Sequence, residues 1–164
     1  MARRSRPRSL VLGALCAVLL GAASPAPPVD FENFTGYPAP PCSVDDEHPP
    51  AFALTRGIYT WSTQAGDAGL DVQFRSASFG HLRGDASTQA AVLLGCDYPN
   101  AMFDQWVDVF DVRAGRATFV ASVRAGYDED RTESATIVRN RLVVMTSEKK
   151  SYALRGSRLV PVPR

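Results

Sequence analysis

The stretch Phe79-Gly-His-Leu-Arg-Gly-Asp-Ala-Ser-Thr-Gln-Ala-Ala-Val-Leu-Leu-Gly-Cys96 joins a polar turn to an apolar strand. Within it, Ala90 to Leu94 is the most continuous apolar run outside the N-terminus, and it is too short for a typical globular helix. Apolar runs of this length between turn residues are typical of central strands, buried on both faces. Cys96 follows at a point where a covalent bond could fix the strand to another part of the chain. We therefore expect the sheet to be built around this strand.

Segments with strand-like patterns flank the central run on both sides. In Leu70-Asp-Val-Gln-Phe-Arg75, three apolar side chains share one face and three polar side chains share the other, as in a half-buried antiparallel strand. Near the C-terminus, Gly156-Ser157 separates two short strand patterns, and a two-residue loop with glycine first predicts a type II′ hairpin. Further strands are expected at 54–62, 105–112, 116–124, 134–138, 141–145, 151–155 and 158–162.

Short strands at regular intervals, with no convincing amphipathic helix after residue 23, predict an all-β chain. We expect an antiparallel meander that forms a sandwich, an open barrel or one curled sheet. About 140 residues after the leader suit one domain with a substantial core. The predicted organisation is a leader over 1–23, a proline-rich arm over 24–50 and a single β domain over 51–164.

The N-terminus has the features of a secretory signal peptide. Four arginines and no acid precede the apolar segment Leu10 to Leu20, and small residues follow it. The segment is shorter than the roughly 20 residues that a transmembrane helix needs, so we expect cleavage near Ala23, with a retained anchor as the alternative. Cys16 follows the bulky Leu15, which argues against a lipoprotein. The expected location is secreted or periplasmic, in a bacterium.

The net charge changes when the leader is removed. Loss of residues 1–23 lowers the number of Lys and Arg from 18 to 14 against 17 Asp and Glu, which leaves a net charge of −3. A small negative net charge argues against nucleic acid as a partner, and against an anionic membrane apart from the signal segment. The expected partner is an unidentified protein or envelope component.

Cys42 and Cys96 are the cysteines that remain after cleavage. In an oxidising compartment they allow one intramolecular pairing, which we expect to form. In the chain-entropy model, closing a loop of this size stabilises the fold by roughly 4 kcal/mol. Two buried free thiols or an intermolecular bridge are the alternatives.

The arm from 24 to 50 holds eight of the twelve prolines. Proline this dense blocks both regular helix and central strand, so the arm is expected to be extended or irregular. A bond at Cys42 would fix its far half to the domain. Phe31, Phe34 and Tyr37 are expected to pack on the sheet, the alternative being an exposed recognition segment.

The segment Phe79 to Asp85, followed by Gln89 to Leu94 and Cys96, resembles the Gly-Asp-Leu-x-Gly-Asp-Gly, Glu-Ala-Val-Val, Cys signature of small exported bacterial proteins with FG-GAP-like, integrin-type β elements. The resemblance extends loosely over half the mature chain. In that family the acidic turn can hold calcium. Here His81 and Ala86 replace an aspartate and a glycine of the motif, so we expect a plain turn, because Ca²⁺ takes six or more oxygen ligands.

Other short motifs have a simpler structural explanation. Arg83-Gly84-Asp85 is an adhesion tripeptide that lies inside the same turn. Ser147 and Lys150 have the Ser-x-x-Lys spacing of penicillin-recognising enzymes, but the partner motifs are absent from the sequence. His48 follows three acids, and one histidine does not make a zinc site. We expect no catalytic, cofactor-binding or metal-binding residues.

These observations favour an exported, disulfide-stabilised, non-catalytic β module of the cell envelope or extracellular space. One alternative is a secreted hydrolase whose site is assembled from scattered carboxylates. Another is a secreted inhibitor that acts through the arm or through the loop 97–103.

Overall fold

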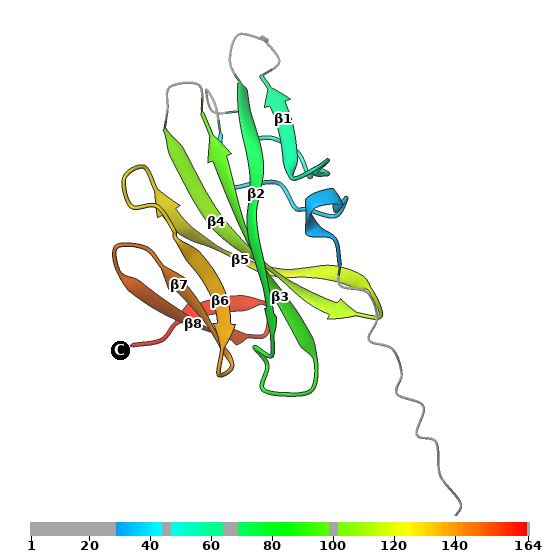
Figure 1. The fold of residues 1–164 in the computed structure, drawn as a ribbon, viewed down its shortest axis with the longest axis vertical. Helices are drawn as coiled ribbons and strands as arrows, with labels where there is room; N and C mark the ends of the chain where they lie inside the picture. The colour runs from blue at the N-terminus through cyan, green and yellow to red at the C-terminus, as the bar shows by residue number, and fades with distance from the viewer. Residues whose placement is uncertain (1–28, 44–46, 64–68, 99–101, 164) are drawn as a thin grey trace, which may run out of the picture.

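The computed structural model describes residues 29–43, 47–63, 69–98 and 102–163 and contains two antiparallel sheets (Figure 1). The strands of each sheet are neighbours in the order of the sequence, so the predicted all-β meander is confirmed, and the described strands form no closed barrel. The first sheet consists of β1 (Ile58–Ser62), β2 (Gly69–Gly80), β3 (Thr88–Asp97), β4 (Phe103–Arg113) and β5 (Arg116–Tyr127). The second consists of β6 (Ser134–Val138), β7 (Arg141–Met145), β8 (Lys149–Arg155) and β9 (Arg158–Pro161).

The central strand β3 is covered on both faces by different parts of the chain. Ala90, Val92 and Leu94 face the segment 29–54, which contributes Phe31, Tyr37 and other apolar residues to this side of the core. Ala91 and Leu93 face the second sheet, where Leu142 and Val144 meet them. The predicted central strand is therefore buried on both faces, between an irregular arm and a second sheet.

Aromatic side chains from the arm fill the space above the first sheet. The ring of Phe31 lies 5.2 Å from that of Phe110, and the ring of Tyr37 lies 5.7 Å from it. Phe34 also packs edge-on against Phe110. The expectation that these arm residues pack on the sheet is confirmed. The arm itself contains a short 3-10 turn, Phe31–Asn33, and a single bridge between Tyr37 and Phe52.

Strand β2 extends five residues past the alternating pattern that predicted it. Leu70 and Val72 share one face as expected, and that face meets the arm, but a bulge between Phe74 and Ser76 shifts the alternation by one residue. A bulge of this kind places two residues opposite one and re-aims those that follow. Ser78 then points to the second sheet, where its hydroxyl accepts a hydrogen bond from the Ile137 N–H.

Close packing between the sheets needs a glycine at the end of β2. A Cβ on Gly80 would lie 2.6 Å from Cγ2 of Ile137 in β6, closer than two carbon atoms can approach. Gly80 therefore lets β6 pack against β2 and β3.

Two strand limits differ in detail from the sequence expectation. The strand expected over 54–62 begins only at Ile58, because Arg56 and Gly57 adopt positive φ angles of 51° and 80° and make a turn. The hairpin between β8 and β9 forms at Gly156-Ser157 as expected. Gly156 has a φ of 60° and Ser157 is not left-handed, as a type II′ turn requires.

Among the described residues, no helix is long and apolar enough to cross a membrane. The predicted leader 1–23, with its cleavage point near Ala23 and Cys16, lies outside the described residues, as do Asp45, Asp46 and the middle of the 97–103 loop.

Candidate functional site

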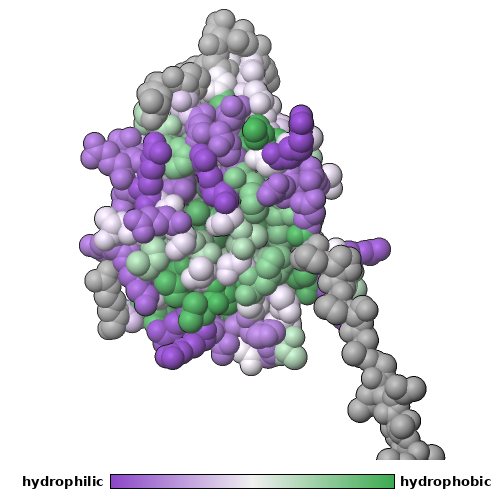
Figure 2. All heavy atoms as spheres, in the orientation of Figure 1, coloured by the Kyte–Doolittle hydropathy of each residue, from purple (hydrophilic) through white to green (hydrophobic). Residues whose placement is uncertain are grey.

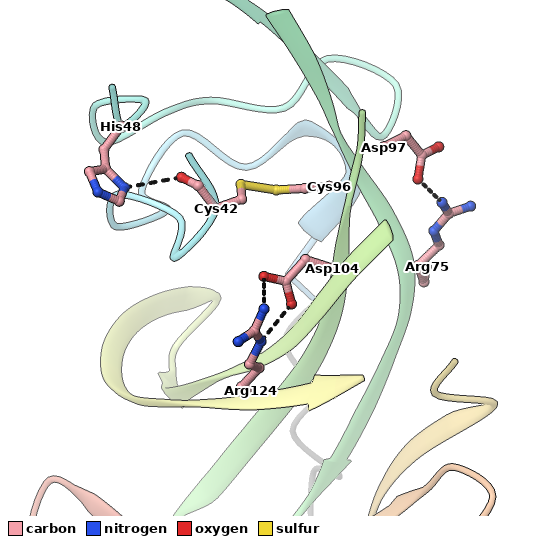
Figure 3. The surroundings of a disulfide bond; sticks show 7 residues. All are labelled: Cys42, His48, Arg75, Cys96, Asp97, Asp104 and Arg124. Atoms are coloured by element: carbon pink, nitrogen blue, oxygen red, sulfur yellow. Dashed lines mark hydrogen bonds and ion pairs between the residues drawn. A yellow bond between two sulfur atoms is a disulfide. The ribbon is translucent and has the colours of Figure 1, made fainter. Parts of the chain in front are cut away.

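The predicted disulfide joins the arm to the end of the central strand (Figure 3). Cys42 and Cys96 are bonded, with side chains 1% and 0% exposed, so the bond is sealed inside the core. The His48 Nδ1 lies 3.2 Å from the carbonyl oxygen of Cys42. His48 thus has a local structural partner. The two cysteines hold the irregular cover against the sheet.

Ion pairs lie on the strands beside the disulfide. Asp104, which pairs with Cys96 across β3 and β4, accepts hydrogen bonds of 3.0 and 2.9 Å from the Arg124 guanidinium. These hydrogen bonds to Asp104 raise the pKa of Arg124. Asp97 accepts a hydrogen bond of 2.9 Å from Arg75, a residue on β2. These two carboxylates are therefore each neutralised by an arginine of a neighbouring strand (Figure 3).

A buried carboxyl lies further along the same face of the sheet. Asp108 is 1% exposed and stands between Trp106 and Phe110 on β4, the residues two positions away on either side. The Ser122 hydroxyl and the Trp106 indole are near enough to lower the pKa of Asp108, but neither carboxylate oxygen has a well-formed hydrogen bond within the described structure. Burial outweighs both groups and raises the pKa of Asp108 to about 6.

Tyr37, a residue of the arm, lies on the same buried side of the first sheet as Asp108. Its hydroxyl donates a hydrogen bond of 2.7 Å to the carbonyl oxygen of Phe31. Burial and, to a smaller extent, the charge of Asp108 raise the pKa of Tyr37, so the phenol stays protonated. Neither group reaches solvent, and a carboxyl with a raised pKa in such a place can bind a proton but cannot contact a dissolved substrate.

The polar turn 81–87 is held by a network around Gln89. Gln89 is fully buried, accepts a hydrogen bond from the Leu82 N–H at 2.7 Å, and donates to Asp111 at 3.0 Å. Arg83 makes two hydrogen bonds of 3.3 and 3.1 Å to the same carboxylate and a third, of 3.3 Å, to the Gly156 carbonyl. The turn therefore connects β3, β4 and the β8–β9 hairpin.

This network includes both charged side chains of the Arg83-Gly84-Asp85 tripeptide. Arg83 is engaged by Asp111 and Gly156, and Asp85 accepts hydrogen bonds from the hydroxyl and the N–H of Ser87. The bonds from Ser87 lower the pKa of Asp85. Both charged side chains serve the turn, and no group of three or more His, Cys, Asp or Glu able to hold a metal ion occurs in the described ranges.

The Ser-x-x-Lys spacing likewise corresponds to a structural contact. The hydroxyl of Ser147 donates to Asp130 at 2.7 Å, and the Lys150 ammonium lies 3.8 Å from the other oxygen of that carboxylate. The bonds from Ser147 lower the pKa of Asp130. These contacts join the β5–β6 loop to the β7–β8 turn. They do not pair the serine with the lysine as an activated nucleophile requires.

Sequence reasoning missed Asp108 and Gln89, the two most deeply buried polar residues near the core. The signal for Asp108 is its place in Trp106-Val-Asp-Val-Phe110, where an acid shares a strand face with two large aromatic residues. Gln89 gave no comparable signal, because its partners come from the turn and from β4, which only the fold brings together.

Comparison with known proteins gives no match: no family model, no curated protein and no solved structure corresponds to this chain.

Proposed function

We propose that this chain is an exported β module, held together by the Cys42–Cys96 bond, that acts by presenting its surface rather than by catalysis. The buried disulfide is the observation that carries the proposal. Stable structural disulfides form in oxidising compartments and are rare in the cytosol. The signal-like N-terminus supplies the route to such a compartment.

Both histidines make structural contacts and the carboxyl with the raised pKa is buried, which supports a non-catalytic role. His48 lies against the Cys42 carbonyl and His81 against the Ser87 carbonyl. Asp108, the carboxyl with the raised pKa, is sealed under the arm. A hydrolase would need such a carboxyl in contact with its substrate.

The resemblance to FG-GAP-like exported proteins is part of the same proposal and implies an envelope or extracellular role. Its calcium-binding property is not carried over, because Asp85 is bound by Ser87 in place of the alternating carboxylates of the motif.

Intact-mass analysis of the protein recovered from outside the cytoplasm of an expressing bacterium tests this proposal. We expect a chain that begins near Ser24 and gains the mass of two hydrogen atoms on reduction. A Cys42→Ala/Cys96→Ala variant is the control, since its mass does not change with reductant. Retention of the full chain in the cytoplasm, with two free thiols, would overturn the proposal.

A further inference from the structure

The charges of this molecule are divided between its two ends. The β2–β3 and β4–β5 turns lie at one end of the first sheet, because Gly80, Gln89, Asp111 and Thr118 follow one another across its strands. The β6–β7 and β8–β9 turns of the second sheet lie at the same end. Arg83 donates to the Gly156 carbonyl, and a Cβ on Gly84 would lie 3.3 Å from the Asn140 side chain.

Seven arginines and two acids lie in the turns at this end, which we call the basic end; Asp30 and Glu32 flank Phe31, whose ring lies 6.1 Å from that of Phe79 beside it. The acids of the turns are Asp111, which Arg83 neutralises, and Asp85, which Ser87 holds. Within the described ranges, the six arginines other than Arg83 have no carboxylate within ion-pair distance, and all six are exposed. The seven are Arg83, Arg113, Arg116, Arg139, Arg141, Arg155 and Arg158.

The opposite end is acidic. Its described strand ends and loops carry eight acids against five cations, and several of the acids are in ion pairs, as Asp97 is with Arg75 and Asp104 with Arg124. The eight are Asp71, Asp97, Asp104, Asp128, Glu129, Asp130, Glu133 and Glu148. The net charge of the whole chain conceals this separation, because the two ends nearly cancel.

Large apolar side chains surround the basic end on both sides. Val138 and Val160 are 50% and 37% exposed on the outer face of the second sheet. Phe79 and Phe119 are 43% and 40% exposed on the arm side of the first sheet. In Figure 2, hydrophilic residues gather at the lower left of the molecule and a hydrophobic area lies directly above them.

An open groove connects the charged and apolar parts on the second sheet. It has a volume of about 580 Å³ and is lined by Val138, Arg139, Arg141, Val143, Lys149 and Ser151. Three cationic side chains beside two valines suit a ligand that carries an anionic head and a short apolar part.

We propose that the basic end docks on an anionic lipid surface. The arginines match the charge of the headgroups, and each basic residue near such a surface contributes to binding. The exposed valines and the exposed phenylalanines lie on opposite faces of the molecule. A membrane into which the whole basic end inserts would contact both of them. A single strand of an anionic polymer would reach one face and would gain little from the aliphatic side chains.

This proposal rests on the proposed function, since an exported module needs a partner in the envelope. The test of docking does not depend on export, because vesicles can be added to the purified protein whether the leader has been cleaved or retained. Export without binding to vesicles would overturn the docking alone. Retention in the cytoplasm would overturn the proposed function alone.

Co-sedimentation with phosphatidylcholine vesicles, with and without phosphatidylglycerol, measures the docking. We expect binding only to the anionic vesicles, weakened by salt. Arg139→Gln/Arg141→Gln should weaken it about 30-fold, the effect of two basic residues at an anionic surface. The matched control is Arg56→Gln/Arg131→Gln, which removes the same charge away from the basic end and should have a much smaller effect. Equal losses for both pairs, or no binding by the unmodified protein, would overturn the proposal.

A second pair of substitutions separates a membrane from a polyanion. Val138→Thr/Val160→Thr keeps every charge and the branched side-chain shape, and should weaken binding to anionic vesicles while leaving retention on a heparin column unchanged. Vesicle binding that is insensitive to the valines, together with strong heparin retention, would identify a polyanion site and overturn the membrane assignment. Circular dichroism of each variant checks that the fold is intact.

Discussion

The two covers of the central strand β3 are built in different ways. The second sheet is a regular four-stranded meander whose strands hydrogen-bond to one another and present aliphatic residues such as Leu142 and Val144 to the core. The arm is irregular and meets the opposite face mainly with aromatic rings. Only the arm is joined to the first sheet by a disulfide among the described residues.

The difference follows from how each segment satisfies its backbone. The arm makes a few scattered hydrogen bonds, such as Phe52 N–H to Tyr37 O and Leu54 N–H to Phe34 O. A segment with so few backbone hydrogen bonds is not stabilised as a sheet is. Ordering it costs conformational entropy that these few bonds do not offset. The Cys42–Cys96 bond offsets part of that cost by restricting the unfolded chain. A regular sheet needs no such bond.

The largest expected effect follows from removing the disulfide. Cys42→Ala/Cys96→Ala should lower the free energy of unfolding by about 4 kcal/mol, as expected for a closed loop of this length. Urea unfolding measures the change. A loss below about 1 kcal/mol would mean that the arm is held by its aromatic contacts alone, and would remove the distinction between the two covers.

Asp108→Asn tests the buried carboxyl under the arm. Because the pKa of Asp108 is raised to about 6 in the folded state, its ionisation is less favourable there than in the unfolded chain. Its contribution to stability is therefore fully present below about pH 4 and declines as the pH rises through 6. The variant should exceed the unmodified protein in stability by up to about 3 kcal/mol at pH 8, with no excess at pH 4.

Paired urea titrations at several pH values measure this difference and cancel the effects of other groups. Among those, Asp85 and Asp130 have lowered pKa values and change stability in the opposite direction. A difference between Asp108→Asn and the unmodified protein that stays constant from pH 4 to pH 8 contradicts the assignment.

Tyr37→Phe tests one polar contact of the arm. It removes the hydrogen bond to the Phe31 carbonyl and leaves a buried acceptor without its partner, at a cost of about 1 to 2 kcal/mol. Tyr152→Phe is the matched control on the other side, because among the described residues the Tyr152 hydroxyl has no hydrogen-bond partner. Equal effects in thermal unfolding would show that the arm does not depend on this contact.

Arg83→Gln should have the smallest effect. The Arg83–Asp111 pair is more than a third exposed on the aspartate side and a third exposed on the arginine side, so solvent screening limits it to less than about 1 kcal/mol. A loss well above that value in the same thermal assay would mean that the turn 81–87, through Gly156, is a main support of the second sheet.

The sequence was informative where local pattern and tertiary structure agree. The run Ala90 to Leu94 predicted a strand buried on both faces, and the glycine-first loop at Gly156 predicted the hairpin that forms. The cysteine pair was predictable because one intramolecular pairing remains after the leader is excluded.

The sequence was less informative where distant segments meet. The bulge after Phe74 extends β2 to Gly80, and no local pattern marks it. Asp108 is perturbed because the arm covers it, which depends on the fold of residues far away in the chain. The charge separation escaped a count over the whole chain, because the arginines gather at one end only once the turns of both sheets are placed together.

Native-state hydrogen exchange of the oxidised and the reduced protein tests most directly the claim that the disulfide secures an otherwise weak cover. After reduction, the amides of Phe52 and Leu54, which donate to carbonyl groups of the arm, should lose most of their protection, while those of Leu142 and Val144 in the second sheet keep theirs. Equal loss of protection in both covers, or retained protection of the arm, would contradict the account.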